Sequence, residues 1–351
     1  MAPSEMKAIK NTAAGKSELQ TVPLPKQRDD YVLVKTTAVA LNPTDWKHVE
    51  YLSQPGHTVG CDFAGVVEEV GPNASGTQKW KKGDRIASWT HGVNNAQAED
   101  GSFAEYVMSK GAIGLRIPQN MSDEEAATLG VGVSTVGQGL YQSLGLPLPG
   151  QQKGEGDWLL VYGGSTATGS LAIQFAKLSG AKVITTCSPH NFDFVKSLGA
   201  QEAFDYNDPE ISKKIKEYTS DKLTKAFDCI SEGASPNICS EAIGSKGGKV
   251  SDLLPTKRDR TDVENQMTLA YTTFGEDFKF GPQPYPANKE DLEFGSKFWE
   301  ITRGLLESGK VKVHPVQVGK GGLQGVFEGL QMLKEGKVSG KKLVYKVRET
   351  S

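Results

Sequence analysis

The sequence predicts an α/β protein in which a β-rich first third precedes a doubly wound parallel sheet. In the first third, residues 32–41 and 63–70 are rich in β-branched side chains and read as strands. From Trp158 onward, short apolar runs alternate with segments of helical periodicity, which is typical of parallel strands joined by helices. Gly supplies 40 of the 351 residues, as expected where many strands turn tightly into helices.

Each expected element has its own local signal. In the first third, the turn Gly-Pro-Asn at 71–73 closes the second strand, a turn and strand follow at 82–87, and helical periodicity first appears at 123–129. The apolar runs expected as parallel strands are 158–162, 182–187, 202–206, 225–231, 248–254 and 268–274. The helices expected between them are 170–178, 193–198 and 210–218. After a Pro/Gly-rich stretch we expect a helix at 294–306, a strand at 311–318 and a final helix and strand.

Length, charge and cysteine use exclude several classes of protein. A chain of 351 residues suggests about two domains. With 40 basic and 42 acidic residues the formal charge is −2, so neither nucleic acid nor an anionic membrane is expected as a partner. The cysteines form no Cys-x-x-Cys pair and read as reduced, buried residues: Cys61, Cys187, Cys229 and Cys239. Without a signal-peptide pattern or a long apolar stretch, we expect a soluble, cytoplasmic protein.

A glycine-rich turn marks a candidate phosphate-binding site. The segment YGGSTATG at 162–169 follows an apolar strand and opens a helix. Backbone N–H groups at a helix N-terminus bind a pyrophosphate, and glycines let the chain approach it closely. Ala167 stands where many dinucleotide-binding loops have Gly. Because any tight turn favours Gly, the prediction depends on the surrounding alternation of strands and helices.

The end of the next strand favours NADP over NAD. NAD-preferring folds usually carry an acidic residue there, which holds the ribose 2′-hydroxyl. Here the strand KVITTC is followed by Ser188, Pro189, His190 and Asn191, with no acid to repel a 2′-phosphate. An ordinary polar turn is the alternative interpretation.

Four motifs together resemble the medium-chain dehydrogenase/reductase superfamily. They are NPTDWK at 42–47, GCDFAGVV at 60–67, KGDR at 82–85 and GSFAEY at 101–106. The resemblance covers nearly the whole chain. It implies a GroES-like catalytic domain formed by residues 1–127 and 282–351, and a Rossmann NADP-binding domain formed by residues 128–281.

The same motifs imply a protein without zinc. In zinc-dependent members the catalytic ligands stand at positions that here hold Asn42, Cys61 with Asp62, and Val131. Val131 cannot bind a metal and Asn42 is a poor zinc ligand, so a three-ligand catalytic site is not available. The region of the structural zinc site, around 90–100, has no Cys.

Within the superfamily, the chain is similar to the fungal trans-acting enoyl reductases of polyketide biosynthesis, of the lovastatin enoyl-reductase type. The matching segments include YGGSTAT at 162–168, SPHNFD at 188–193 and FDY at 204–206. The contacts to NADPH that this similarity implies fall on Thr44, Asp45, Trp46, Lys47, Ser165, Thr166, Ala167, Thr168, Ser188, Pro189, His190, Asn191, Tyr206, Leu253, Leu254, Val338 and Ser339. The implied walls of the substrate tunnel are Thr135, Val136, Gly137, Gln138, Gly139, Leu140, Tyr141 and Gln142, together with Ala270, Tyr271, Thr272, Thr273 and Phe274.

Without zinc, a ketone or alcohol substrate lacks a Lewis acid, whereas an activated alkene needs less assistance. Hydride goes to the β-carbon, the carbonyl oxygen takes up enolate charge, and the α-carbon needs a proton. The similarity places Lys47 and Thr135 at this reaction. Lys47 could instead be a surface or cofactor-binding lysine, and Thr135 a structural hydroxyl.

Three functions follow from this reading. The first is an NADPH-dependent, zinc-independent reductase of an enoyl thioester or enone in fungal secondary metabolism, acting on a free or carrier-protein-bound acyl substrate beside a polyketide synthase. The second is an NADPH:quinone-type oxidoreductase. The third is a nucleotide-binding scaffold without turnover.

Overall fold

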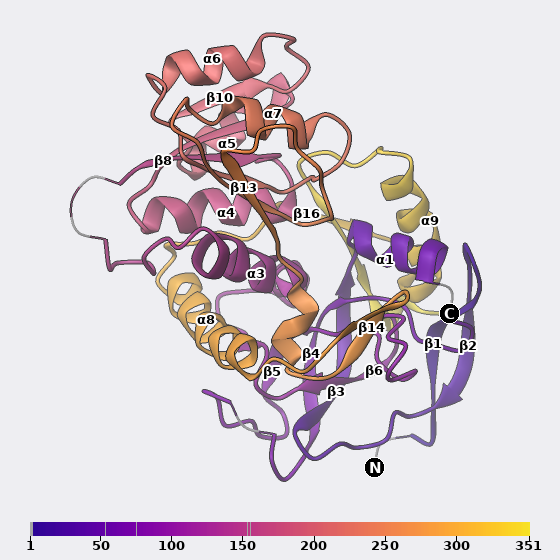
Figure 1. Ribbon diagram of the computed structural model, residues 1–351. Coiled ribbons are helices and arrows are strands. Elements are labelled where there is room, and N and C mark those ends of the chain that lie inside the picture. Colours follow the sequence, from indigo (N-terminus) through magenta and orange to yellow (C-terminus); the bar gives the residue numbers. More distant parts are fainter. Residues whose placement is uncertain (1–2, 53, 75, 153, 155) are drawn as a thin grey trace. The chain divides into compact units, whose positions relative to one another are not determined.

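The computed structural model describes residues 3–52, 54–74, 76–152, 154 and 156–351 (Figure 1). The chain divides into two compact units. Unit 1 contains the chain through Ser134 and resumes at Tyr271, and unit 2 spans Thr135–Ala270. The functional domains predicted from the sequence, with boundaries after residues 127 and 281, stay a prediction.

Unit 1 is built on a seven-stranded, mostly antiparallel sheet. Its strands are β3 (Tyr31–Ala40), β4 (Asp62–Val70), β5 (Arg85–Trp89), β6 (Tyr106–Lys110), β7 (Leu115–Arg116), β16 (Val316–Gly319) and β17 (Lys342–Lys346). The order is β16-β17-β3-β4-β5-β7, with β6 also paired to β3, and only β16 and β17 run parallel. The strands predicted at 32–41 and 63–70 are confirmed as β3 and β4. Val39 lies opposite Phe63 in their register, and both are fully buried in one core.

A separate hairpin of β1 (Glu5–Ala13) and β2 (Lys16–Pro23) was not expected from the sequence. The strand β2 reads KSELQTVP, and every side chain in it is exposed or half-exposed. The segment therefore lacks the apolar alternation by which strands are recognised. On the other strand, Ala8 and Lys10 make single bridges to Ala104 and Thr58.

The remaining elements of unit 1 are helices, helical turns and a second hairpin. They are α1 (Pro43–Lys47), η1 (His48–Leu52), α2 (Asp123–Ala126), η4 (Ala270–Phe274), β14 (Phe278–Phe280), β15 (Gln283–Tyr285), α8 (Lys289–Glu307), α9 (Gly322–Lys334) and η5 (Val347–Glu349). Helix α3 (Gly130–Val136) and η4 cross the boundaries of the unit. Helix α8 begins five residues before the predicted 294 because the Asn288 side chain caps it, accepting from the Asp291 N–H.

Unit 2 is a six-stranded, fully parallel sheet. Its strands are β8 (Trp158–Tyr162), β9 (Lys182–Cys187), β10 (Glu202–Asp205), β11 (Lys225–Asp228), β12 (Gly248–Asp252) and β13 (Val263–Met267). Its helices and helical turns are η2 (Gly137–Ser143), α4 (Ala167–Leu178), η3 (Pro189–Asn191), α5 (Phe192–Leu198), α6 (Ile211–Tyr218) and α7 (Ser235–Ala242). The order β10-β9-β8-β11-β12-β13 reverses direction between β8 and β11, which is the Rossmann topology. The predicted doubly wound sheet is confirmed.

The strand predicted at 268–274 is wrong. The sixth strand is β13, which reads VENQM, and residues 270–274 form the short helix η4. Because β13 lies at the edge of the sheet, only Val263 in it is buried, so its sequence is too polar to be recognised as a strand. The strand predicted at 225–231 is also shorter. It ends at Asp228, whose carboxylate accepts the N–H groups of Ile230 and Ser231 and bends the chain. The strand predicted at 311–318 begins only at Val316, after Pro315.

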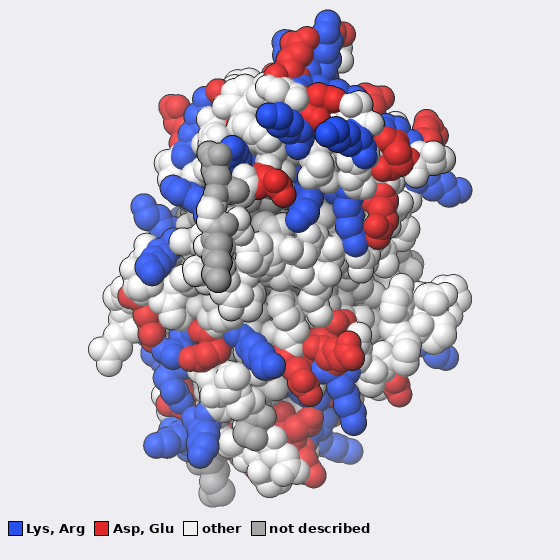
Figure 2. Space-filling model, turned by 60° about the vertical axis from the view of Figure 1, so that its left-hand side comes forward, with Lys and Arg blue, Asp and Glu red and all other residues white. Residues whose placement is uncertain are grey.

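The distribution of surface charge and the state of the cysteines agree with what the composition predicts. In the face that Figure 2 shows, basic and acidic side chains are interspersed. All four cysteines are free and buried, as predicted. Among the described residues, no helix combines the length and the apolar content that a membrane crossing needs.

Candidate functional site

The candidate phosphate loop, residues 162–169, lies where β8 ends and α4 begins, at the point where the strand order reverses. Thr166 is the N-cap of α4, and its hydroxyl accepts the Gly169 N–H at 2.9 Å. A Cβ on Gly169 would lie 2.2 Å from the Gly163 carbonyl oxygen, and one on Gly164 would lie 2.0 Å from Thr185 Oγ1. These glycines therefore hold the loop close to the sheet. The predicted residues Ser165, Thr166, Ala167 and Thr168 are half-buried around the helix N-terminus, where backbone donors favour an anion.

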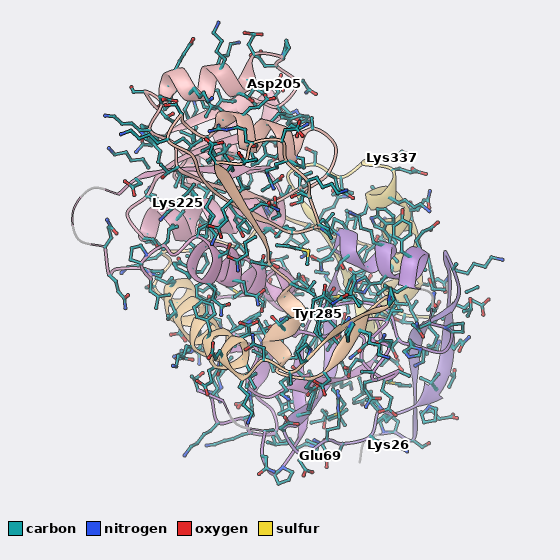
Figure 3. The ribbon with its side chains drawn as sticks, in the orientation of Figure 1. Lys26, Glu69, Asp205, Lys225, Tyr285 and Lys337 are labelled. Carbon is teal, nitrogen blue, oxygen red and sulfur yellow. The ribbon has the colours of Figure 1, made fainter. Side chains whose placement is uncertain are left out.

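A second part of unit 2 brings together two predicted cofactor residues from neighbouring strands. Ser188 follows β9 and Tyr206 follows β10, and their hydroxyl groups lie 3.1 Å apart. Asp205, which is labelled in Figure 3, ends β10 and pairs with Cys187 at the end of β9. The two hydroxyls therefore follow neighbouring strands at the same edge of the sheet. Tyr206 is 41% exposed. The end of β9 carries the neutral Ser188 where NAD-preferring folds carry an acid.

The other predicted cofactor residues of unit 2 lie on the turns that follow the strands. Pro189, His190 and Asn191 form η3, directly after Ser188. Leu253 and Leu254 follow β12, and the Leu253 N–H donates to Ser231 Oγ at 2.8 Å. Arg258 holds the same turn through two hydrogen bonds of 2.6 Å to the Asp252 carboxylate, with both side chains buried.

In unit 1, the predicted residues Thr44, Asp45, Trp46 and Lys47 lie on α1. Asn42 is the N-cap of this helix, and its backbone N–H donates to Asp45 Oδ2 at 2.6 Å. Pro43 stands at the first helical position, where the backbone N–H has no partner within the helix, so a residue without an N–H is tolerated. The predicted residues Val338 and Ser339 follow α9, which packs beside α1 (Figure 1), and Val338 and Trp46 pack against the same core.

The helix α1 also contributes to a buried polar cluster that joins three side chains. Thr44 Oγ1 lies 3.0 Å from His48 Nε2 and 3.0 Å from Tyr271 Oη, and Tyr271 Oη lies 3.3 Å from His48 Nε2. His48 is 3% exposed and Tyr271 is 5% exposed. Burial lowers the pKa of His48 to about 4 and raises the pKa of Tyr271 well above its ordinary value. Thr44 and Tyr271, predicted for the cofactor and for the substrate, are thus brought into direct contact.

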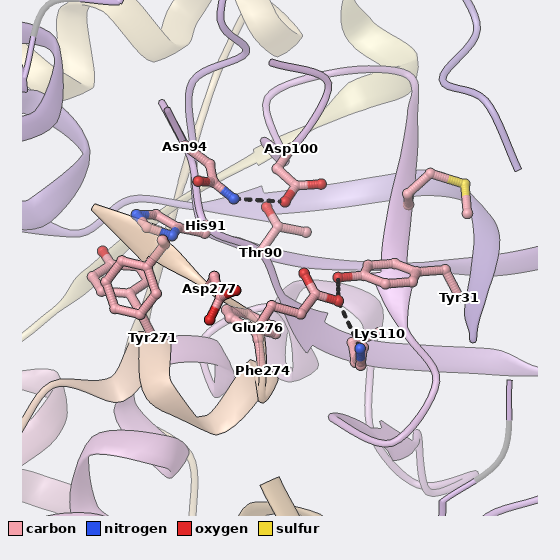
Figure 4. A pocket seen from close by; sticks show the side chains of 12 residues that line it. Tyr31, Thr90, His91, Asn94, Asp100, Lys110, Tyr271, Phe274, Glu276 and Asp277 are labelled. Atoms are coloured by element: carbon pink, nitrogen blue, oxygen red, sulfur yellow. Dashed lines mark hydrogen bonds and ion pairs between the residues drawn. The ribbon is translucent and has the colours of Figure 1, made fainter. Parts of the chain in front are cut away.

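A pocket in unit 1 opens beside this cluster. Tyr271 lines it together with His91, on which its ring is stacked at 4.0 Å between centroids (Figure 4). On the opposite wall, Glu276 accepts hydrogen bonds of 2.6 Å from Tyr31 Oη and from Lys110 Nζ. These bonds fix the segment that follows η4, and with it the position of Tyr271.

The positions at which the resemblance places zinc ligands hold another cation. Asp62 Oδ2 accepts from Lys342 Nζ at 2.6 Å, and Asp62 Oδ1 accepts the Val131 N–H at 2.7 Å. Lys342 Nζ also donates to Asn42 Oδ1 at 2.7 Å, and the Lys342 side chain is 2% exposed. A Zn²⁺ ion at these oxygens would lie against a buried ammonium. Burial raises the pKa of the nearby Cys61 thiol, which opposes the thiolate form that binds zinc.

These residues therefore do not fit a zinc ion. In the described part of the chain, no group of three or more His, Cys, Asp or Glu side chains is placed to hold a metal.

The residues predicted to line the substrate tunnel lie on two helical segments. Thr135 and Val136 end α3, and residues 137–142 belong to η2, in unit 2. Within this segment, Gly139 packs against the Phe227 ring and Tyr141 Oη lies 3.1 Å from Ser179 Oγ. The second segment, Ala270–Phe274, is the helix η4. Its member Thr273 is fully buried, and Thr272 donates a hydrogen bond to Asp291.

Comparisons with known proteins agree with this architecture. Residues 28–119 match the alcohol dehydrogenase GroES-like domain, and residues 167–251 match the family described as zinc-binding dehydrogenase. The chain is 48% identical to trans-enoyl reductase ACTTS2 of Alternaria alternata over 97% of this chain and 98% of that protein. It is 46% identical to trans-enoyl reductase resD of Aspergillus sclerotiorum, over 97% and 100%. The chain belongs to the fungal trans-enoyl reductases of the medium-chain dehydrogenase/reductase superfamily.

Solved structures share the fold at low sequence identity. An alcohol dehydrogenase superfamily protein from Novosphingobium aromaticivorans matches with a TM-score of 0.81 at 21% identity, covering 97% of this chain and 99% of its own. The CurK enoyl reductase matches with a TM-score of 0.75 at 18% identity, covering 98% and 99%. The predicted fold, a GroES-like part and a Rossmann part, is thereby confirmed.

Sequence reasoning missed two residues of the site. They are His48 and Lys342. Both receive their roles from partners far away in the sequence, Tyr271 for His48 and Asp62 for Lys342. The local signal for Lys342 is weak: this Lys opens the apolar run Leu-Val-Tyr of β17.

Proposed function

We propose that this trans-enoyl reductase is an NADPH-dependent, zinc-independent enzyme that reduces the activated C=C bond of an enoyl thioester or enone in fungal secondary metabolism. The observation that carries the proposal is the match to ACTTS2, at 48% identity over nearly the full length of both chains. The substrate is an acyl chain, free or bound to a carrier protein, and the partner is a polyketide synthase.

The residues of unit 2 fit a dinucleotide. The loop Ser165–Thr168 would hold the pyrophosphate, because α4 directs its first N–H groups there and the neighbouring glycines keep side chains away. Ser188 and Tyr206 would hold the adenosine ribose and its 2′-phosphate through their hydroxyl groups. When bound, NADPH supplies a hydride to the β-carbon of the alkene.

The reaction also needs electrostatic stabilisation of the charge that develops on the substrate. The enolate oxygen that develops needs hydrogen-bond donors, and Lys47 on α1 and Thr135 on α3 are the candidates for this role. In place of a metal, the ammonium of Lys342 neutralises Asp62 and fixes the N-cap of α1 through Asn42. The helix that carries Thr44 and Lys47 is thereby positioned without a metal ion.

The test is a panel of acceptors with NADPH as the donor. The proposal expects oxidation of NADPH with enoyl thioesters or conjugated enones, with the saturated carbonyl compound as product. Turnover with quinones alone would assign the quinone-type activity instead. Binding of NADPH without oxidation by any acceptor would assign the scaffold function.

A further inference from the structure

The cluster of Thr44, His48 and Tyr271 is a closed ring of hydrogen-bonding groups, with three contacts of 3.0, 3.0 and 3.3 Å. On the far side of the imidazole, His48 Nδ1 lies 2.8 Å from the Gly92 carbonyl oxygen. A carbonyl oxygen only accepts, so Nδ1 carries the proton and Nε2 is left as an acceptor. The neutral imidazole therefore accepts a hydrogen bond at Nε2 from the hydroxyl of Thr44 or Tyr271.

Packing alone does not require this oxygen on Tyr271. Its ring stacks on His91 and lies 5.3 Å from the Trp89 ring, contacts that Phe would make equally well. Burying a hydroxyl in an aromatic cluster costs free energy unless it is hydrogen-bonded. Here Thr44 and His48 satisfy it, and Cys61 Sγ lies 3.9 Å away. The cluster is thus arranged around the phenol oxygen.

The three residues of this hydrogen-bonded cluster differ in their exposure to solvent. His48 and Tyr271 are buried, whereas Thr44 is half-buried on α1. Protons can enter at Thr44 and reach Tyr271 through one hydrogen bond. His48 cannot supply a proton near neutral pH, because burial lowers its pKa to about 4. Its part is to orient the two hydroxyl groups.

We propose that Tyr271 donates the proton that completes the reduction, with Thr44 reloading it and His48 as a positioning residue. The inference rests on the proposed function. After hydride has reached the β-carbon, the electron pair of the enolate forms a C–H bond at the α-carbon and the O–H bond of Tyr271 breaks. The phenolate takes the proton of Thr44, which takes one from water. Hydride and proton together account for the two hydrogens gained, and the phenol is restored.

The experiment uses an α-methyl enoyl thioester, whose product has a defined configuration at the protonated carbon. For Tyr271→Phe we expect kcat at least about a hundredfold below wild type, the contribution typical of a general acid. Residual product should be a mixture of configurations, because water then protonates either face. The dissociation constant of NADPH and the melting temperature should stay near wild type.

The matched control is Tyr285→Phe. Tyr285 lies in the β14–β15 hairpin (Figure 3), and its ring stacks on Phe278. Its variant should turn over within about twofold of wild type. A second test variant, Thr44→Val, keeps the shape and removes the reloading hydroxyl. It should slow turnover by about tenfold and still give a single configuration, because Tyr271 still delivers the proton.

The outcomes separate this inference from the proposed function. Wild-type turnover with an equally active, stereoselective Tyr271→Phe would overturn the inference alone. A mixture of configurations from Thr44→Val, with a single one from Tyr271→Phe, would also overturn it. A wild type that binds NADPH and reduces no alkene would overturn the proposed function, and the inference with it.

Discussion

The ammonium of Lys342 lies 2.6 Å from the Asp62 carboxylate, and both side chains are almost completely buried. The same ammonium donates to Asn42, the N-cap of α1. One internal cation thus joins β17, β4 and the start of the helix that carries the predicted cofactor residues. A metal ion is not needed for this connection.

Removing this cation should destabilise the protein strongly. Lys342→Met leaves Asp62 as an unpaired buried charge, which costs about 3–5 kcal/mol of unfolding free energy. Urea denaturation should show this loss and a partial recovery in the double variant Lys342→Met/Asp62→Asn. As a control, Lys82→Met removes an exposed lysine paired with Glu68 and should leave the denaturation midpoint unchanged. Equal midpoints for all variants would contradict the role assigned to Lys342.

Asp45 should make stability depend on pH. Burial raises the pKa of its carboxyl from 3.8 to about 7 in the folded protein. Between these two values the folded state keeps a proton that the unfolded state has lost, so the stability contributed by Asp45 falls as pH rises toward about 7. Asp45→Asn keeps an oxygen for the Asn42 N–H and cannot ionise. The unfolding free energy of wild type minus that of the variant should therefore decrease from pH 5 to pH 7, by up to about 1.4 kcal/mol per pH unit. A constant difference would be inconsistent with a protonated Asp45.

Ser188 should control the choice of nucleotide. Ser188→Asp places a negative charge beside Tyr206, where the 2′-phosphate is proposed to bind. The affinity for NADPH should fall by at least about tenfold relative to that for NADH, because the charges repel. Fluorescence titration with both nucleotides measures the ratio. Ser197→Asp adds the same charge to an exposed position of α5 and should leave the ratio unchanged.

Lys47 should matter more for turnover than Thr135. If Lys47 stabilises the enolate, Lys47→Ala should lower kcat/KM for an enoyl thioester more than tenfold, since about 1.4 kcal/mol corresponds to a factor of ten. Thr135→Val should have a smaller effect, because a backbone donor or water can replace its hydroxyl. Circular dichroism serves as the folding control. Near wild-type activity in Lys47→Ala would reduce this lysine to a packing residue.

Local patterns predicted the parallel sheet well because its inner strands are short, apolar and separated by helices. The strands at 158–162 and 182–187 have the predicted bounds. The same reasoning failed for β2, in the separate hairpin, and for β13, at the edge of the parallel sheet. Both strands expose most of their side chains, so their sequences are polar.

The site shows a similar limit. The candidate phosphate loop at 162–169 is contiguous in the sequence, so a local pattern is enough to propose it, and its contacts to a nucleotide stay a prediction. The hydrogen bonds of Tyr271 to Thr44 and His48, and that of Lys342 to Asp62, form only when segments more than 200 residues apart meet. No local pattern carries such a contact.

Above all, we claim that hydride passes from NADPH to a carbon–carbon double bond without a metal ion. The most direct measurement uses NADPH labelled with deuterium at the transferred position, chelator-treated protein and an enoyl thioester. We predict deuterium at the β-carbon of a saturated thioester, at the same rate with and without chelator. Loss of turnover on chelation, or deuterium on the carbonyl carbon of an alcohol product, would contradict the claim.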